Sequence, residues 1–598
     1  MLKTFRAYFF LLVFIFVCSL HAEESNDQEK VEDAISKEEP VDQNNEENIV
    51  SDEKPDQKIP KTTSSKDDEI LVKALKGIII LSPEIARSRK ECSKLKKKQI
   101  AGFEGIYIKG LSIPDESDFY DQMESFLGKP ITFDFLQTIK QSIIRFYKKQ
   151  GFNIADVTIP AGQEITSGVV QFVVCVGKLG KVAVEGGKYF SKKQIRNLIR
   201  TEKGEEIAFD QMQEDLLWIN DNPFRNVSLL FEPGENVGET DVNLHLSDRY
   251  PLRFYGGYEN TGNLIAGTSR YLAGVNWGNF FKLDHRFNYQ YMCAFPMKKW
   301  HGHSYSYIAP LSWRNILKVF GSYVKTKPKM EDGLFLSKGK SWYAAFRYHV
   351  PFKTGDVQNE FYFGYDFKRT NNFLSYQTEL IFNTYMDISQ LILGQEGLYE
   401  YKIGSTSWNL VLYLSPGKTT KYNRDKYFRA ERDGAKANYF YFDLYFDQTL
   451  FMPYDFSWVL TSQFQYATGK LLPTEQLSLG GYYTVRGYQE NKVISDRGIL
   501  LRNEIRTPAI NLSEGKTPRK HDLQFLGFID FGWAADVDQN ILSKESTILA
   551  SVGVGCRYNL MNYITFRFDY GWQLESIHRI IDDSGKHSRF HLGLILSY

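Results

Sequence analysis

The stretch Phe528-Ile529-Asp530-Phe531-Gly532 decides the class of fold, because it alternates aromatic residues with a carboxylate and a glycine. Side chains in a strand repeat with a period of two, so Phe528, Asp530 and Gly532 share one face. If this strand belongs to a membrane β-barrel, its charged Asp530 can face only the lumen. An Arg that pairs with it must then also lie inside the barrel, and the run Val485-Arg486-Gly487-Tyr488 offers one.

Similar strands recur from residue 251 to residue 598, at a spacing suited to antiparallel hairpins. Residues 252–258, 359–365 and 439–445 are three examples that are rich in Phe and Tyr. The stretch holds roughly sixteen strands, an even number of the kind that bacterial outer-membrane barrels have. Because hydrocarbon offers no water to unpaired backbone groups, the sheet must close on itself, and we predict a transmembrane β-barrel over residues 250–598. A soluble β-sandwich is the alternative, but it explains the many aromatic residues less well.

Composition limits the other classes. The chain has 598 residues, which is too long for a single core, so we expect several domains. Aromatic residues make up 15%, and no apolar run of helical membrane-spanning length follows the N-terminus, which excludes a helical membrane protein. The net charge of +1 argues against nucleic acid as a partner.

The N-terminus has the features of a secretory signal peptide at residues 1–22: Lys3 and Arg6 precede an apolar run that ends before Ala22. Residues 23–70 are acidic and polar, so we predict a disordered segment, either a solvated spacer or a partner-binding tail. Residues 71–100 are assigned to a linker or plug helix. Their apolar start fits a short helix or a strand, and periodicity alone does not decide between them.

Two similar α/β units follow, at residues 101–179 and 180–249. In the first, a strand near residues 106–108 precedes two helical stretches, and strands at 153–159 and 169–176 close the unit. In the second, Ser191 and Gln194 have the spacing of a capping box, and strands are predicted near 226–231 and 241–246. The second helical stretch of the first unit places apolar residues on one face: Leu136, Ile139, Ile143, Phe146 and Tyr147. Both units therefore have the order β-α-α-β-β.

This order resembles that of polypeptide-transport-associated (POTRA) domains. Three runs are similar to those of two-partner secretion transporters of the haemolysin-activator type: Tyr147-Lys148-Lys149-Gln150-Gly151-Phe152, Ile159-Pro160-Ala161-Gly162-Gln163 and Asn222-Pro223-Phe224-Arg225. These transporters belong to the superfamily of outer-membrane assembly and translocation barrels. The resemblance implies an outer-membrane pore with periplasmic POTRA domains, which secretes one haemolysin-like or adhesin-like partner protein by type V secretion. An outer-membrane barrel assembly factor is the alternative, since it shares the Arg and Asp motifs.

The resemblance also implies how the client is captured. POTRA domains present a sheet edge to which an unfolded polypeptide adds as a strand. We place this edge at residues 169–174, with Val169, Val170, Phe172 and Val174 as client-binding residues. The alternative is that both units are spacers.

A lock inside the barrel is the third implication. Counted from Pro251, the eleventh strand lies near 456–467 and the twelfth near 498–506, which puts Arg486 in the sixth extracellular loop. The resemblance implies that this loop folds back into the lumen and that Arg486 pairs with Asp530. An ordinary lumenal charge pair without a gating role is the alternative. The supporting residues are Val485, Gly487, Tyr488, Phe528 and Gly532, with Gly487 allowing a tight tip and Gly532 leaving room for it.

The C-terminus ends with Gly593, Leu596 and Tyr598 at a spacing that resembles the signal read by the barrel-assembly machinery. Outer-membrane lipid, this machinery and periplasmic chaperones are the further partners that we expect. Neither a catalytic nor a phosphate-binding motif is found in the sequence, so we predict a transporter without catalytic residues, cofactor or metal. The cysteines that follow the signal peptide are scattered, without the spacing of a metal site or a disulfide framework: Cys92, Cys175, Cys293 and Cys556.

Overall fold

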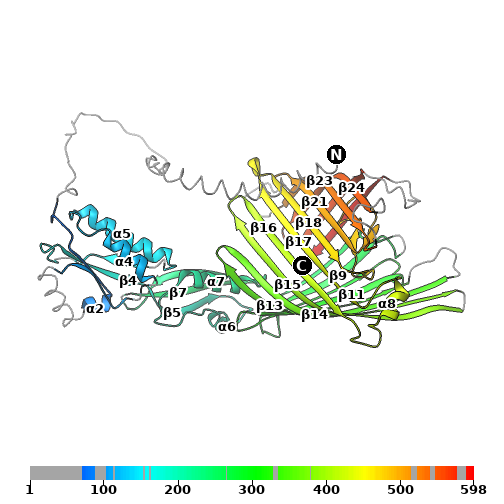
Figure 1. Cartoon of the computed structure of the whole chain (residues 1–598), viewed down its shortest axis with the longest axis horizontal. Helices are drawn as coiled ribbons and strands as arrows, with labels where there is room; N and C mark the ends of the chain where they lie inside the picture. Colours follow the sequence, from blue (N-terminus) through cyan, green and yellow to red (C-terminus); the bar gives the residue numbers. More distant parts are fainter. Residues whose placement is uncertain are drawn as a thin grey trace, which may run out of the picture. The chain divides into compact units, whose positions relative to one another are not determined.

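The computed structural model describes residues 70–87, 103–327, 335–512, 521–538, 546–574 and 587–598, except positions 112, 114, 153–154, 161–162, 237, 264–265 and 377–378. The predicted signal peptide and all but the last residue of the predicted acidic segment lie outside these ranges. The described chain forms two α/β domains followed by a β-barrel (Figure 1). No helix in the described ranges is both long and apolar enough to cross a membrane.

The first domain is a four-stranded sheet in the order β2-β1-β4-β3, packed against helices. Helix α5 starts after Thr132, whose hydroxyl accepts a hydrogen bond from the Phe135 N–H at 3.1 Å, and its last turn is basic. The apolar face predicted from the sequence is buried against the sheet. The strands are β1 (Gly77–Leu81), β2 (Gly105–Lys109), β3 (Ala155–Thr158) and β4 (Val169–Val176), and the helices are α2 (Pro83–Arg87), α4 (Glu116–Glu124) and α5 (Phe133–Lys149).

Strand β1 corrects the assignment to a linker or plug helix for residues 71–87, while residues 88–100 lie outside the described ranges. Its five residues are all buried, and it pairs in parallel with both β2 and β4 at the centre of the sheet. The strand alternative therefore holds, and the first domain starts before residue 101. An unbroken apolar run is typical of a strand that is buried on both faces. Because such a run does not alternate, its sequence alone does not distinguish a strand from a helix.

The second domain has a three-stranded sheet in the order β5-β7-β6. At the start of α6, the Ser191 hydroxyl accepts a hydrogen bond from the Gln194 N–H at 3.4 Å, which is one half of the predicted capping box, while Gln194 Nε2 donates to the Lys282 carbonyl at 3.1 Å. Helix α7 packs Met212 and Ile219 onto the sheet. The elements are β5 (Lys178–Gly186), α6 (Lys192–Arg196), α7 (Phe209–Asn220), β6 (Arg225–Pro233) and β7 (Glu239–Asp248).

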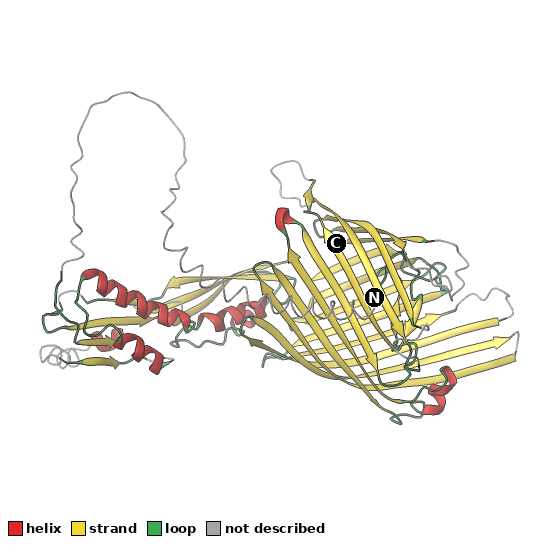
Figure 2. Ribbon diagram, turned by 45° about the horizontal axis from the view of Figure 1, so that its top comes forward, coloured by secondary structure: helices red, strands yellow, loops and turns green. Residues whose placement is uncertain are grey.

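The barrel is a closed antiparallel sheet of 16 strands, as predicted. Figure 2 shows them side by side as one wall. The two-residue β22 pairs with β23 beside the end of β21, so we count both as the twelfth strand. The strands are β8 (Leu252–Glu259), β9 (Arg270–Phe280), β10 (His285–Cys293), β11 (Trp300–Pro310), β12 (Ile316–Thr326), β13 (Phe335–Thr354), β14 (Val357–Tyr376), β15 (Glu379–Tyr401), β16 (Gly404–Pro416), β17 (Asn438–Phe451), β18 (Ser457–Ala467), β21 (Arg497–Arg506), β22 (Ile510–Asn511), β23 (His521–Ala535), β24 (Thr547–Leu560), β25 (Ile564–Gln573) and β26 (Ser588–Ser597).

Alternation along the strands separates the two faces of the wall. On β23, Phe528 and Asp530 are buried toward the lumen, whereas Phe525 and Ile529 are exposed on the outside. The first and last strands, β8 and β26, close the barrel over five residue pairs. Beyond them, Tyr598 and Phe254 exchange two backbone hydrogen bonds of 2.8 and 3.0 Å. The predicted terminal signal thus lies at the seam, where Gly593 pairs with Glu259, and Leu596 and Tyr598 are exposed.

Two connections matter for the site. Loop 5, residues 417–437, joins β16 to β17 and contains α8 (Asp425–Glu431). Loop 6, residues 468–496, joins β18 to β21 and contains the short paired strands β19 (Leu477–Leu479) and β20 (Val493–Ser495). The turn between β17 and β18 contains the 3-10 helix η2 (Pro453–Asp455). The eleventh and twelfth strands, β18 and β21, start within one residue of the predicted positions and flank Arg486 as expected.

Candidate functional site

Loop 6 folds into the barrel and brings Arg486 onto β23. The Arg486 Nε donates to Asp530 Oδ2 at 2.7 Å, and Nη2 donates to Asp530 Oδ1 at 2.8 Å. The backbone N–H of Arg486 donates to the same Asp530 Oδ2 at 3.0 Å. Neither side chain is exposed to solvent. The structure therefore brings the two predicted residues together in a bidentate pair, the strongest arrangement that these groups can make.

Two further carboxylates surround the Arg486 guanidinium. Its Nη1 donates to Glu504 Oε1 on β21 at 2.7 Å, and Asp569 Oδ1 on β25 lies 3.7 Å away. The Phe528 ring lies beneath it, with its centroid 3.5 Å from the central carbon of the guanidinium. Other arginines balance the additional carboxylates: Arg506 pairs with Glu504 at 2.6 Å, and Arg557 pairs with Asp569 at 2.9 Å. Loop 6 is thus held by a buried charge network that joins several strands.

Gly487 and Gly532 lie where the tip of loop 6 approaches the wall closely. Gly487 has a φ of +89°, which favours glycine, and a Cβ there would lie 3.0 Å from the Gly571 carbonyl oxygen. A Cβ on Gly532 would lie 2.9 Å from Val485 Cγ2, so the absence of a side chain leaves room for the tip. The tip is also bound through its backbone, because Gln573 Nε2 donates to the Gly487 carbonyl at 2.7 Å and the Gly487 N–H donates to His591 Nε2 at 3.2 Å.

Apolar contacts complete the seat of the tip. Val485 is fully buried, and the hydroxyl of the nearly buried Tyr488 donates to the Ala550 carbonyl at 3.0 Å. These residues pack with others from loop 6 and the wall: Leu477, Leu479, Leu500, Ala534 and Leu549. The tip is therefore a packed plug and not a freely solvated loop.

Sequence reasoning missed four wall residues that bind the tip: Glu504, Asp569, Gln573 and His591. Finding them requires the register between strands. Glu504 lies opposite Phe528, and Asp569 lies opposite Gly555 and His591. Their signal in the sequence is a polar residue at every second position of an aromatic strand, which marks a lumenal face but does not name its partner.

The predicted client-binding residues do not lie on an open edge. Strand β4 lies between β1 and β3 in the sheet, although β3 pairs only with residues 173–176. The side chains of Val169, Val170, Phe172 and Val174 are fully buried. The prediction that these four side chains bind a client is therefore wrong, and the predicted edge is covered by β3 at residues 173–176 and by the Gln163 side chain at Gln171.

Amide side chains cover backbone groups in both N-terminal domains. In the first domain, Gln163 donates through Nε2 to the Gln171 carbonyl at 3.1 Å and accepts from the Gln171 N–H at 2.7 Å. In the second domain, Asn220 bonds to the N–H and carbonyl of Val227 on β6 in the same way, at 2.7 and 2.9 Å. Each amide therefore occupies the hydrogen-bonding groups that an added strand would use.

The Asn222-Pro223-Phe224-Arg225 run joins the second domain to the barrel. Arg225 makes a bidentate pair with Asp284, which follows β9, at 2.6 and 2.7 Å. Asn222 Nδ2 donates to the Gly278 carbonyl of β9 at 2.6 Å. Farther along, Arg314 of the barrel pairs with the fully buried Asp215 of α7 at 2.8 Å. This motif therefore has a structural role at the junction of the two parts.

One lumenal cluster has the residue types of a metal site. The ligand atoms of His349, Glu360 and Glu396 lie within 4.8 Å of one another. Lys318 Nζ lies 3.4 Å from Glu360 Oε1 and 3.3 Å from His349 Nδ1, and His349 itself contacts Glu360. Lys318 thus places an ammonium group beside Glu360, one of the two carboxylates of the cluster.

The chain is similar to several known proteins. A family model described as "Haemolysin secretion/activation protein ShlB/FhaC/HecB" matches residues 238–558. The heme/hemopexin transporter protein HuxB of Haemophilus influenzae (strain 86-028NP) is 23% identical over 489 residues, which cover 80% of this chain and 83% of HuxB. The outer membrane transporter CdiB of Dickeya dadantii (strain 3937) is 20% identical over 454 residues, or 72% and 75% of the two chains. The solved structure of CdiB from Escherichia coli covers 90% of this chain and 93% of its own with a TM-score of 0.72 at 15% identity, and shows the same fold.

Proposed function

Because the chain belongs to the haemolysin secretion/activation protein family ShlB/FhaC/HecB, we propose that it exports one cognate, extended, haemolysin-like or adhesin-like protein to the cell surface. The barrel lies in the outer membrane, and the two POTRA-like domains lie in the periplasm. Members of such two-partner systems act with a secreted partner protein. The observation that carries the proposal is a polar barrel lumen into which loop 6 folds and in which its tip is bound to the wall.

Loop 6 is the lock in this proposal. The Arg486–Asp530 pair fixes the tip on β23 in the conformation that is competent for transport. Support comes from its complete burial and from the three carboxylates that converge on one guanidinium. A charge network of this kind holds the loop in one register along the wall, because any shift leaves a buried charge without its partner.

Client capture is assigned to the two POTRA-like domains, by strand addition at their outer strands. Since β4 lies between two other strands, the outer strands β2 and β3 of the first sheet and β5 and β6 of the second are the ones to which a client could add.

The barrel has further partners in this proposal. Exposed aromatic residues on the barrel, such as Phe361 and Phe363, fit contact with outer-membrane lipid. The seam strand β26 is the segment that the barrel-assembly machinery would receive from periplasmic chaperones.

The test is co-expression with a large secreted protein encoded beside this gene, in a Gram-negative host. Secretion of that protein only when the transporter is present supports the proposal. If the protein is instead an assembly factor, depletion of this protein should lower the amounts of unrelated outer-membrane barrel proteins. A loss of those proteins, with the candidate client unaffected, would overturn the secretion assignment.

A further inference from the structure

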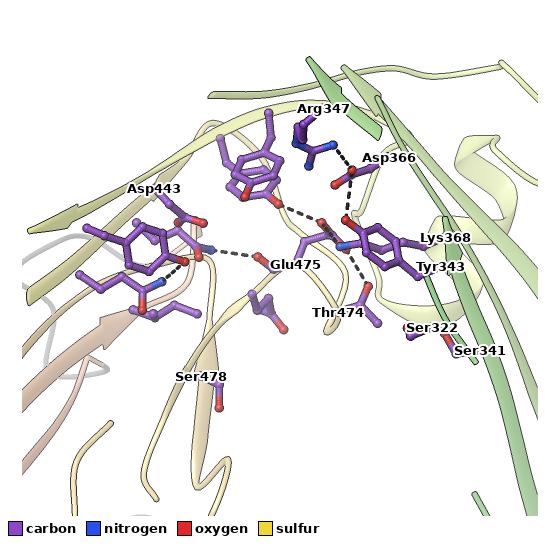
Figure 3. Close-up of a pocket in the computed structure, with 17 residues that line it drawn as sticks. Ser322, Ser341, Tyr343, Arg347, Asp366, Lys368, Asp443, Thr474, Glu475 and Ser478 are labelled. Carbon is purple, nitrogen blue, oxygen red and sulfur yellow. Dashed lines mark hydrogen bonds and ion pairs between the residues drawn. The ribbon is translucent and has the colours of Figure 1, made fainter. Parts of the chain in front are cut away.

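Loop 6 is bound to the wall at a second place, far in strand order from its tip. Glu475 accepts hydrogen bonds from Lys368 Nζ on β14 at 2.8 and 3.0 Å (Figure 3). It also accepts one from Gln390 Nε2 on β15 at 3.0 Å and one from the Tyr441 hydroxyl on β17 at 2.9 Å. The Glu475 side chain is 1% exposed. The tip contacts strands β21 to β26, whereas Glu475 contacts strands β14 to β17. Loop 6 therefore bridges two different parts of the lumenal wall.

The residues around Glu475 form a short strap. We define the strap as residues 473–476. On one side of it, the Leu471 N–H donates to Asp496 Oδ1 at 2.9 Å, and Arg432 of loop 5 donates to the Leu471 carbonyl at 2.6 Å. On the other side, Leu477 is buried in the apolar seat of the tip. Both ends are thus fixed. The middle is held by the side chain of Glu475, by its carbonyl, which accepts from Gln465 Nε2 at 3.0 Å, and by Gln476 Nε2, which donates to Asp496 Oδ1 at 3.2 Å.

A polar cavity lies beside the strap. Its volume is about 590 Å³, and it borders Glu475 and Lys368 (Figure 3). Across the cavity, Asp366 pairs with Arg347 at 2.6 Å and accepts a hydrogen bond from the Tyr343 hydroxyl at 3.2 Å. Asp443 and Gln463 also line it. Charged and hydroxyl groups on all sides fit water and the backbone of an extended polypeptide, both of which exchange hydrogen bonds readily.

The two attachments differ in how readily they separate. Arg486 is fully buried, so withdrawing it leaves carboxylates without a partner in a site that excludes water. Lys368 is 22% exposed and borders the cavity, so water can solvate both charges as Glu475 leaves. Release of the strap therefore costs less free energy than release of the tip.

We propose that Glu475 is a positioning residue that closes the lumen by holding the strap against β14, β15 and β17, and that its release opens the cavity to the client while Arg486 keeps the tip on β23. This inference rests on the proposed secretion function. It goes beyond that function by naming the part of loop 6 that moves and the part of the wall, β12 to β18, along which the client passes.

The test measures the pore without a client. In planar bilayers, Glu475→Gln keeps the size of the side chain but removes its charge, and we expect the open population to rise roughly twofold to fivefold, the range for a partly hydrated ion pair. Lys368→Met removes the other partner and should act in the same direction. Glu400→Gln, an identical change at an exposed position of β15, is the matched control and should leave conductance unchanged.

Folding and secretion complete the test. Heat-modifiable migration on a gel shows that each variant has formed its barrel, and both variants should still secrete the client. Wild-type conductance in the folded Glu475→Gln and Lys368→Met proteins would refute the proposal that the strap closes the lumen. A loss of secretion equal to that of Arg486→Ala would also refute it. Because conductance needs no client, a failure of the proposed function appears separately, as a wild-type protein that secretes nothing.

Discussion

The replacement Arg486→Ala tests the lock most directly. It removes two donors to Asp530 and one to Glu504, all within 2.8 Å, from a site with no solvent exposure. Breaking a buried ion pair by removing one partner costs about 3–5 kcal/mol. The remaining arginines offset part of this cost, because Arg502 and Arg506 stay 3.5 and 2.6 Å from Glu504. We therefore expect the lower end, about 3 kcal/mol, which weakens the attachment of the tip roughly a hundredfold.

The assay compares secretion with barrel assembly in the same cells. The ladder hydrogen bonds of the barrel do not involve the Arg486 side chain, so heat-modifiable protein should reach wild-type amounts while secretion falls and conductance fluctuates. Arg486→Lys keeps the charge but loses the bidentate geometry, and should be intermediate. The swap Arg486→Asp with Asp530→Arg should not restore activity, because residue 486 would then place a carboxylate beside Glu504 and Asp569. Full secretion by Arg486→Ala at matched protein levels would refute the reasoning.

Three other changes follow from the structure. Arg225→Ala breaks the bidentate pair with Asp284 at the junction, and limited proteolysis of the full chain should then cut between the second domain and the barrel faster than in Arg249→Lys, with the barrel intact; equal rates would contradict a fixed junction. Gln163→Ala leaves the Gln171 peptide groups without their amide partner, so hydrogen–deuterium exchange at Gln171 should quicken, whereas protection as strong as in the wild type would show that another group replaces it. Deletion of Tyr598 removes two backbone hydrogen bonds at the seam and should lower the yield of heat-modifiable barrel, while Tyr598→Phe should preserve it; an unchanged yield after deletion would count against the terminal signal.

The sequence predicted the barrel and the pairing partners of its lock, but not the network around them. Alternation is a local property, so Asp530 could be assigned to the lumen from its neighbours alone. Glu504 and Asp569 reach Arg486 only through the register of β21 and β25, which depends on pairing across the whole sheet. The same limit explains the error at Val169 to Val174. A strand's sequence indicates burial, but whether it is an inner strand depends on β1, a segment about ninety residues earlier in the chain.

A lock built from charges suits a pore that must pass an unfolded chain. If the moving contact between loop and wall were apolar, opening would expose apolar surfaces to which apolar residues of an unfolded client would adhere. When Glu475 leaves Lys368, or Arg486 leaves Asp530, the separated groups can instead be hydrated, and hydrated groups bind a passing polypeptide weakly. The desolvated pair at Arg486 and the pair at Lys368 that borders the cavity then form a graded series, with the costlier contact at the fixed tip and the less costly one at the moving strap. This order predicts that combining Glu475→Gln with Arg486→Ala gives the secretion defect of Arg486→Ala. Release of the strap opens the cavity, but it does not restore the attachment of the tip to β23.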